Sequence, residues 1–235
     1  EMTAAILSRQ GAVLATRGNL NNDIGVPLTL LRLTPEHQFA VVEMGANHAG
    51  EIAYLTELAR PEASVITNAA AAHLAGFGSL EGVANAKAEI FSGLGESGTA
   101  VINADDNFAS QWYEVAGDRR VIRFGLDHEA EVTAKWSTEP DGSRMLLKMH
   151  GSDVECRLAL LGRHNVINAL AAAALATAIG SSGDDIAAGL GSVEPVPGRL
   201  MPRAALNDGR LIDDSYNANP ASLQAGIEVL AGLPG

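Results

Sequence analysis

The sequence contains a single cysteine, Cys156, so it can form neither an internal disulfide nor a cysteine-based zinc site. Aromatic residues make up only 4% of the 235 residues, although hydrophobic residues make up 47%, so the core must be built mainly from Ala, Val, Leu and Ile. The longest apolar stretch, Ala169 to Ile179, is too short to cross a bilayer. These scarcities predict a soluble protein of a reducing compartment, which we take to be the cytoplasm, with no membrane span.

Positive charge is also scarce. The formal net charge is -12, which argues against sequence-independent binding of nucleic acid, because that requires clustered Lys and Arg. Only three lysines are present, Lys87, Lys135 and Lys148, and none of them follows a glycine-rich loop. The sequence therefore shows no lysine at the end of a phosphate-binding loop.

The pattern of apolar runs predicts an α/β fold with a mostly parallel central sheet and flanking helices. Four strand-like runs alternate with helical segments, namely Val13–Ala15, Phe39–Glu43, Ala63–Thr67 and Thr99–Asn103. The helical segments are Met2–Gln10, Pro27–Leu33, Gly50–Ala59 and Leu80–Phe91. From residue 120 to residue 160 four consecutive strands with hairpin turns predict an added antiparallel region, and helices over 164–179 and 184–190 follow.

The segment Val196-Pro197-Gly198 reads as a linker, so we predict a domain of residues 1–196 and the beginning of a second domain over 197–235. Two strands, over 201–206 and 210–212, and a helix over 222–230 are expected in the second part, with a turn over 207–209. The first helix has no capping residue in front of it, and the chain stops directly after a helix. We therefore expect the sequence to be a fragment of a longer protein.

Two polar turns follow predicted strands. The turn over 213–220 reads Asp-Asp-Ser-Tyr-Asn-Ala-Asn-Pro, and the apolar run from Phe39 ends in Glu43, followed by Gly, Asn and His. Ligands of open α/β sheets gather at the carboxyl ends of strands, so both turns are candidate ligand sites. The alternatives are a plain surface turn for the first, because Asp and Asn bond their own backbone, and an ion pair with a nearby arginine for Glu43.

Eight short motifs in order make the sequence similar to a known family. They lie at residues 18–27, 42–51, 68–74, 86–91, 101–106, 162–165, 197–199 and 213–220, and they span almost the whole chain. Together they resemble the Mur ligases of bacterial cell-wall synthesis. Within that family the Asn-rich first loop and the turn over 213–220 favour the members that add D-alanyl-D-alanine to UDP-N-acetylmuramoyl-tripeptide.

The resemblance implies a three-domain, monomeric ligase that uses ATP and Mg²⁺ to activate a carboxylate as an acyl phosphate before forming an amide. It also implies that this sequence comprises the central ATPase domain without its phosphate-binding loop and the start of a Rossmann-like third domain. Because that loop cradles the phosphates, we expect this chain by itself neither to ligate nor to hydrolyse ATP. The alternatives are another ligase of the superfamily, such as folylpolyglutamate synthetase, and a non-catalytic nucleotide-binding-fold domain.

The resemblance assigns catalytic and metal-binding roles to a few residues. Metal ligands would be Glu43, His73 and Lys87, the lysine after carbamylation, and the catalytic set would be Lys87, His73 and Arg199. From the residues alone, His73 could instead bond the backbone of its loop, Lys87 could be a surface or ion-paired lysine, and Arg199 could be a solvated linker residue.

The resemblance also implies binding residues. The nucleotide would be bound by Arg199 at the phosphates, Asn165 near the adenine and Asp214 at the ribose, with Asn168, Asn103 and Asp105 in the same region. The substrate would be contacted by residues of the two polar loops, namely Asn19, Asn21, Asn22, Tyr216, Asn217 and Asn219. For the first three, holding a tight loop is an equal alternative, and Asn168 could simply serve packing.

Overall fold

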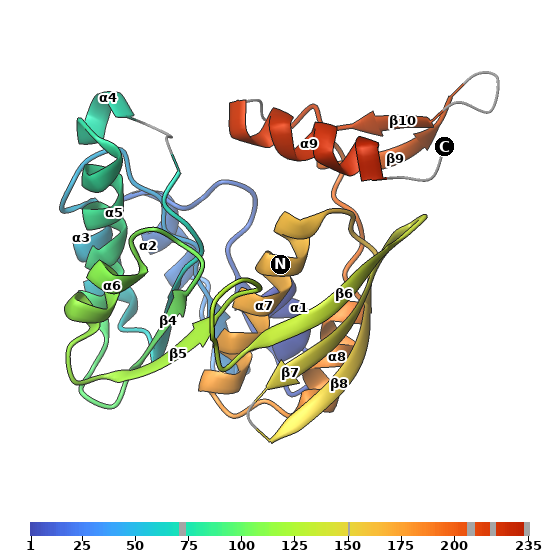
Figure 1. Cartoon of the computed structure of the whole chain (residues 1–235). Coiled ribbons are helices and arrows are strands. Elements are labelled where there is room, and N and C mark those ends of the chain that lie inside the picture. The colour runs from blue at the N-terminus through green and yellow to red at the C-terminus, as the bar shows by residue number, and fades with distance from the viewer. Residues whose placement is uncertain (71–73, 150, 206–209, 217–219, 233–235) are drawn as a thin grey trace.

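The computed structural model describes residues 1–70, 74–149, 151–205, 210–216 and 220–232 (Figure 1). The predicted α/β class is confirmed, with parallel sheets and an added antiparallel region. Within the described residues the parallel strands form two sheets rather than one. Strand β1 (Val13–Ala15) pairs with β2 (Phe39–Val41), and β3 (Ala63–Ile66), β4 (Thr99–Asn103) and β5 (Arg120–Phe124) pair in that order.

Strand β5 corrects the sequence interpretation. The sequence grouped it with the antiparallel region, but it pairs parallel with β4, with Thr99 opposite Arg120. A parallel neighbour requires a crossover connection. Helix α6 (Ala109–Ala116), which the sequence analysis did not predict, supplies that crossover. The antiparallel sheet therefore contains three strands: β6 (Thr133–Glu139), β7 (Gly142–Met149) and β8 (Ser152–Leu158).

Strand β4 occupies the centre of the three-stranded sheet, and all five of its residues are buried. Val101 packs into a core with α7 (Arg163–Ala178), whereas Ala100 and Ile102 face a second core with α5 (Leu80–Ala88) and α6. The alternation of side chains along a strand produces these two faces. Figure 1 shows the result, with α5 and α6 on one side of β4 and α7 on the other.

Helix α7 lies between the parallel sheet and the antiparallel sheet (Figure 1). Its buried face is mostly alanine, and such small side chains allow close packing of both sheets on the helix. Phe124 of β5 and Leu147 of β7 belong to the same core as Leu170 of the helix. This packing explains how a chain poor in aromatic residues builds a dense interior.

The remaining helices complete the first part of the chain. They are α1 (Met2–Leu7), α2 (Gly25–Leu30), α3 (Glu51–Ala59), α4 (Leu74–Phe77) and α8 (Gly183–Gly191), with a 3₁₀ turn, η1 (Glu89–Gly93), after α5. Helix α1 packs against α7 and α8. In the described part of the chain, none of the helices is long and apolar enough to cross a membrane.

The C-terminal segment consists of strands β9 (Met201–Ala204) and β10 (Arg210–Asp213), paired antiparallel, and helix α9 (Pro220–Gly232). The predicted turn over 207–209 lies outside the described residues. Leu200 and Val229 of this segment form a small separate core with Leu161, which precedes α7. The proposed domain boundary at residues 196 and 197 remains a prediction.

Candidate active site

A cavity of about 430 Å³ opens where the parallel strands end. It is bounded by the segment after β2, including Gly45 and Asn47, the segment after β3, including Thr67 and Asn68, and one face of α5. Because ligands of α/β proteins bind outside the carboxyl ends of parallel strands, this cavity is the candidate active site. Three of the residues that the sequence singled out, Asn21, Asn22 and Lys87, line it.

Glu43 stands at the edge of this cavity, held by the first loop. Its Oε1 accepts a hydrogen bond of 2.7 Å from the side-chain amide of Asn21, and its backbone N–H donates to Thr16 Oγ1 at 2.9 Å. The predicted end of this strand is wrong. The strand ends at Val41, before Glu43; Phe39 and Val41 are partly buried and Ala40 is exposed. Among the described residues no arginine pairs with Glu43.

Lys87 extends from the last turn of α5 into the cavity wall, and its Nζ donates a hydrogen bond of 2.7 Å to the backbone oxygen of Asn68. Burial lowers the pKa of its ammonium group, while the negative charge of Asp106 acts in the opposite direction. A snorkelling surface lysine would place its ammonium group in water. Lys87 instead contacts the loop after β3 beside the cavity.

Asp106 is a residue that the sequence analysis did not assign. Its carboxylate accepts a hydrogen bond of 2.8 Å from the backbone of Ala69 and one of 2.9 Å from Phe108. It thereby fixes the loop whose Asn68 oxygen contacts Lys87. The acidic turn after Asn103 was visible in the sequence, but the sequence could not show which of its two carboxylates faces the loop after β3.

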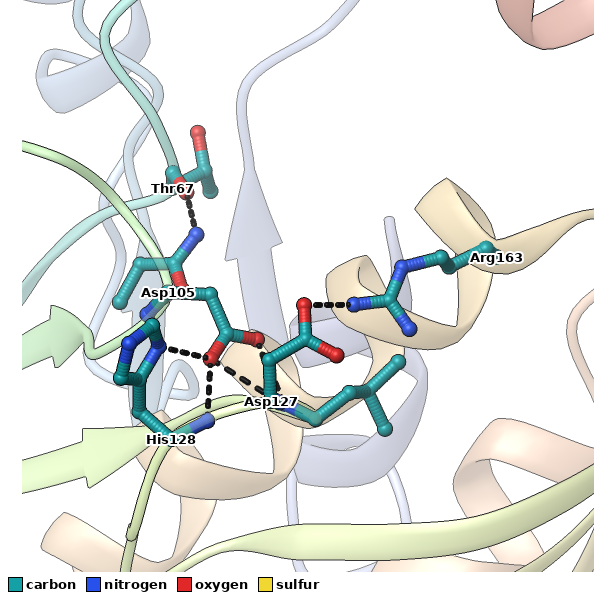
Figure 2. A network of polar contacts seen from close by, with 7 residues as sticks. Thr67, Asp105, Asp127, His128 and Arg163 are labelled. Atoms are coloured by element: carbon teal, nitrogen blue, oxygen red, sulfur yellow. Dashed lines mark hydrogen bonds and ion pairs between the residues drawn. The ribbon is translucent and has the colours of Figure 1, made fainter.

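Asn103, the last residue of β4, and Asp105, two residues further on, bond to neighbouring loops (Figure 2). The buried amide of Asn103 donates to Thr67 O at 2.8 Å and accepts from the Asp105 backbone at 3.0 Å. The Asp105 carboxylate accepts from backbone N–H groups of Leu126, Asp127 and His128 in the loop after β5. Burial would raise its pKa, but these hydrogen bonds outweigh burial, so the pKa of Asp105 is lowered.

Three other predicted residues meet at the C-terminal segment. The guanidinium of Arg199 lies 4.3 Å from the centre of the Tyr216 ring, a cation–π contact, and both side chains are exposed. Asp214 Oδ1 accepts a long hydrogen bond of 3.3 Å from the backbone of Leu200. The Tyr216 backbone donates to Gly198 O at 2.9 Å, which brings the turn over 213–216 against the linker.

The two asparagines of α7 differ in environment. Asn165 is half-buried and its amide donates to Leu161 O at 2.8 Å, whereas Asn168 is exposed. Their neighbour His164, which the sequence analysis did not assign, lines a cavity of about 380 Å³ between the start of α7 and α9. Burial lowers the pKa of His164, while the charges of Asp214 and Glu228 oppose that change.

Several predicted residues are not brought to the cavity. Asn19 is exposed in the first loop and is not among the residues that line it. Asn22 lines the cavity but also uses its Oδ1 to accept from Gly25 N at the start of α2. His73, Asn217 and Asn219 lie outside the described residues. Among the residues that are described, no three His, Cys, Asp or Glu side chains are grouped as a metal site.

The comparison with protein families settles the family. The Mur ligase middle domain matches residues 1–176. This chain belongs to the Mur ligase family. The UDP-N-acetylmuramoyl-tripeptide–D-alanyl-D-alanine ligase of Escherichia coli K12 is 54% identical over 237 residues, covering 100% of this chain and 52% of the relative. The Haemophilus influenzae ligase of the same name is 48% identical, with 99% and 51% covered. The chain thus spans about half the length of the curated relatives that it matches.

Solved structures agree with this family assignment. A crystal structure of MurF from Acinetobacter baumannii has a TM-score of 0.94 at 40% identity, covering 100% of this chain and 51% of that protein. The MurF ligase from Thermotoga maritima, in complex with ADP, has a TM-score of 0.88 at 29% identity, covering 100% and 54%. A mutant FPGS from L. casei, with a TM-score of 0.70 and 14% identity, shares the fold alone.

Proposed function

We propose that this chain is the central part of an ATP-dependent ligase that joins D-alanyl-D-alanine to UDP-N-acetylmuramoyl-tripeptide in peptidoglycan synthesis. The proposal is supported by relatives of that name at 54% and 48% identity. The observation that carries it is the cavity at the strand ends, with Lys87 in its wall and Glu43 held at its edge. We also propose that the ligase acts as a monomer in the cytoplasm.

In the proposed reaction the terminal carboxylate of the tripeptide takes the γ-phosphoryl group of ATP, giving an acyl phosphate and ADP. The amine of D-alanyl-D-alanine attacks the acyl carbon and loses a proton. The tetrahedral intermediate then collapses to the amide and inorganic phosphate. Catalysis of such a reaction depends on positioning and on stabilising negative charge. Mg²⁺, when bound, supplies that stabilisation at the phosphoryl oxygens.

The residues at the cavity fit a magnesium ion. Mg²⁺ prefers oxygen ligands, and the Glu43 carboxylate has a neutral amide rather than a cationic side chain as its described partner. Its negative charge is therefore available to a metal ion. The burial that lowers the pKa of Lys87 favours the neutral amine, and a neutral amine can add carbon dioxide. The resulting carbamate would give Lys87 an anionic oxygen ligand. His73 would complete the set.

The other assignments remain part of the proposal. Arg199 would contact the phosphates of ATP with its guanidinium fork, Asn165 and Asn168 the adenine, and Asp214 the ribose. Asn103 and Asp105 would act in the same region. Substrate contacts would come from the two polar loops, through Asn19, Asn21, Asn22, Tyr216, Asn217 and Asn219.

The alternatives can be ranked. A folylpolyglutamate synthetase activity is the weaker candidate, because FPGS shares 14% identity with this chain while the ligases named above share 54% and 48%. A non-catalytic domain would not require Lys87 to lie in a cavity wall with a lowered pKa. Substitution of Lys87, described below, distinguishes a non-catalytic domain from an enzyme.

The test uses the ligase at the full length of its relatives, with formation of the amide product from ATP and both substrates as the assay. Absence of product from the wild-type protein would reject the proposed function. In Lys87→Ala we expect turnover to fall at least about 100-fold, because even the partners behind a metal ligand contribute about 10–100-fold. Lys135→Ala, which removes an exposed lysine of β6, is the matched control and should retain wild-type turnover.

Added short-chain carboxylates separate the two proposed roles of Lys87. If the lysine is carbamylated, formate or acetate should partly restore turnover of Lys87→Ala by replacing the lost anion. A variant that stays inactive with them would keep Lys87 in the site but reject carbamylation. A Lys87→Ala enzyme as active as Lys135→Ala would remove Lys87 from the site.

A further inference from the structure

The carboxylate of Asp105 is the centre of a hydrogen-bond network that lies beside the candidate cavity (Figure 2). Its side chain is only 9% exposed. Oδ2 accepts from Leu126 N at 2.6 Å, and Oδ1 accepts from Asp127 N at 3.0 Å and from His128 N at 2.8 Å. The ring Nδ1 of His128 is a further partner of Oδ1, at 3.1 Å. Both oxygens are thus occupied by donors of this chain.

The loop after β5 is shaped around that carboxylate. A Cβ atom on Gly125 would lie 2.8 Å from Asp105 Oδ1 and 2.9 Å from its Cγ, which is closer than side chains approach, so glycine allows the contact. On its other side Asp105 is tied to Asn103, whose amide reaches Thr67 at the end of β3. The network therefore joins the segments that follow three neighbouring parallel strands.

The same loop reaches helix α7. Asp127 Oδ2 lies 2.5 Å from the guanidinium of Arg163, the first residue of that helix. The N-cap residue of α7 is Gly162, so no capping side chain accepts a hydrogen bond from the first turn. A negative charge near a helix N-terminus is also favourable to the helix dipole. The Asp127–Arg163 pair is therefore the side-chain contact that links the loop after β5 to the first residue of α7.

We propose that Asp105 is a positioning residue, which fixes the loop over 125–128 and, through Asp127 and Arg163, orients the first turn of α7. That turn carries Asn165, which the proposed function places at the adenine of ATP, so the inference rests on the proposed function. The body of α7 is already held by the core. The effect of the network is therefore confined to the first turn, and it concerns nucleotide binding rather than the chemical step.

The test compares Asp127→Asn and Asp105→Asn with Asp141→Asn in the full-length ligase. Asp141 is a matched control, because its exposed carboxylate also lies 2.5 Å from an arginine, Arg157, but on the antiparallel sheet. We expect Asp127→Asn to raise the KM for ATP about two- to five-fold, which corresponds to the ~0.5–1 kcal/mol of an exposed ion pair. kcat should stay within about two-fold of wild type, because the change weakens ATP binding equally in the ground state and the transition state.

Asp105→Asn should raise the KM for ATP further, by about ten-fold, because a hydrogen bond to a charged acceptor is stronger and an amide replaces one acceptor oxygen by donors. An Arg163→Gln change should add nothing to Asp127→Asn if the pair acts as a unit. A KM for ATP that matches Asp141→Asn in every variant would overturn the proposal. So would a fall in kcat with KM unchanged, which would place Asp105 at the reacting groups.

Hydrogen exchange gives a readout that does not depend on ligase activity. The backbone N–H groups of Asn165 and Val166 bond to Gly162 O at 3.1 Å and 3.3 Å. Their exchange should be faster in Asp127→Asn and Asp105→Asn than in wild type or Asp141→Asn. Unchanged exchange would refute the positioning role even in an active ligase. Faster exchange in a protein that forms no amide product would reject the proposed function and leave the positioning of α7 standing.

Discussion

A single methyl group on Gly189 should separate helix α8 from helix α1. A Cβ atom at this position would lie 2.3 Å from Ile6 Cα and 2.7 Å from Ile6 N. Carbon atoms prefer separations of about 3.5–4.0 Å, so one helix would have to move by roughly 1 Å. The obstacle is backbone of a fully buried residue, which cannot rotate away. Gly189→Ala therefore tests whether these two helices pack as described.

The magnitude follows from two opposing effects. Overpacking a core costs about 1–3 kcal/mol, and a clash with backbone belongs at the upper end of that range. Alanine instead of glycine within a helix contributes about 1 kcal/mol in the favourable direction. The free energy of unfolding should therefore fall by about 2 kcal/mol. For a chain of this size that corresponds to a decrease in Tm of about 4–8 °C.

The measurement is thermal unfolding of the 235-residue chain followed by circular dichroism. Gly191→Ala is the matched control in the same helix, because its Cβ would have Arg157 O, at 3.6 Å, as its nearest neighbour. That variant should have the wild-type Tm or a slightly higher one. If Gly189→Ala is as stable as Gly191→Ala, the close packing of α1 on α8 is refuted.

Three further predictions concern Glu43, Asp214 and His164. In the full-length ligase, Glu43→Gln should nearly abolish turnover without lowering Tm, since the amide keeps the shape but loses the charge; wild-type turnover would remove Glu43 from the metal site. Asp214→Ala should mainly raise the KM for ATP, because ribose contacts act on ground and transition states alike; a large fall in kcat at unchanged KM would assign Asp214 another role. For His164, burial lowers the folded-state pKa, so the unfolded chain binds a proton first as pH falls. The free energy of unfolding should therefore decrease as the pH falls below about 6.5, the ordinary pKa of histidine. His164→Gln should flatten the dependence of Tm on pH in that range. Equal slopes in the two proteins would contradict this.

Two short strands could be predicted well from the sequence. Val13–Ala15 and Thr99–Asn103 agree with β1 and β4 residue for residue. Both have an uninterrupted apolar centre, and the buried residues include Leu14 of β1 and the whole of β4, so local pattern and tertiary position coincide. Strand β2 ended early, because the Glu43 backbone donates to Thr16 Oγ1 instead of continuing the ladder. This hydrogen bond depends on a residue of another loop, so the sequence of the segment 39–43 alone does not indicate where the strand ends.

Helix α6 could not be predicted because its buried surface is small. Only Ala109, Trp112 and Ala116 are buried, and most of the other positions carry polar residues. Tertiary contacts stabilise the helix, because the Trp112 side chain is fully buried and its Nε1 donates a hydrogen bond to Ala84 O in α5. Without that helix the sequence offered no crossover before β5. The wrong direction assigned to β5 therefore follows from one missed contact.

The candidate site shows why a sequence cannot separate residues that hold loops from residues that bind ligands. Asp and Asn suit both tasks, because their short side chains bond the backbone of neighbouring loops. The structure separates the two roles, because it shows which carboxylate oxygens already accept hydrogen bonds from the protein. Both oxygens of Asp105 accept hydrogen bonds from the loop after β5, whereas within the described residues Glu43 uses only Oε1, to accept from Asn21. A carboxylate with a free oxygen at the edge of a cavity can bind a cation, whereas the hydrogen bonds that Asp105 accepts use its oxygens to hold the neighbouring loop.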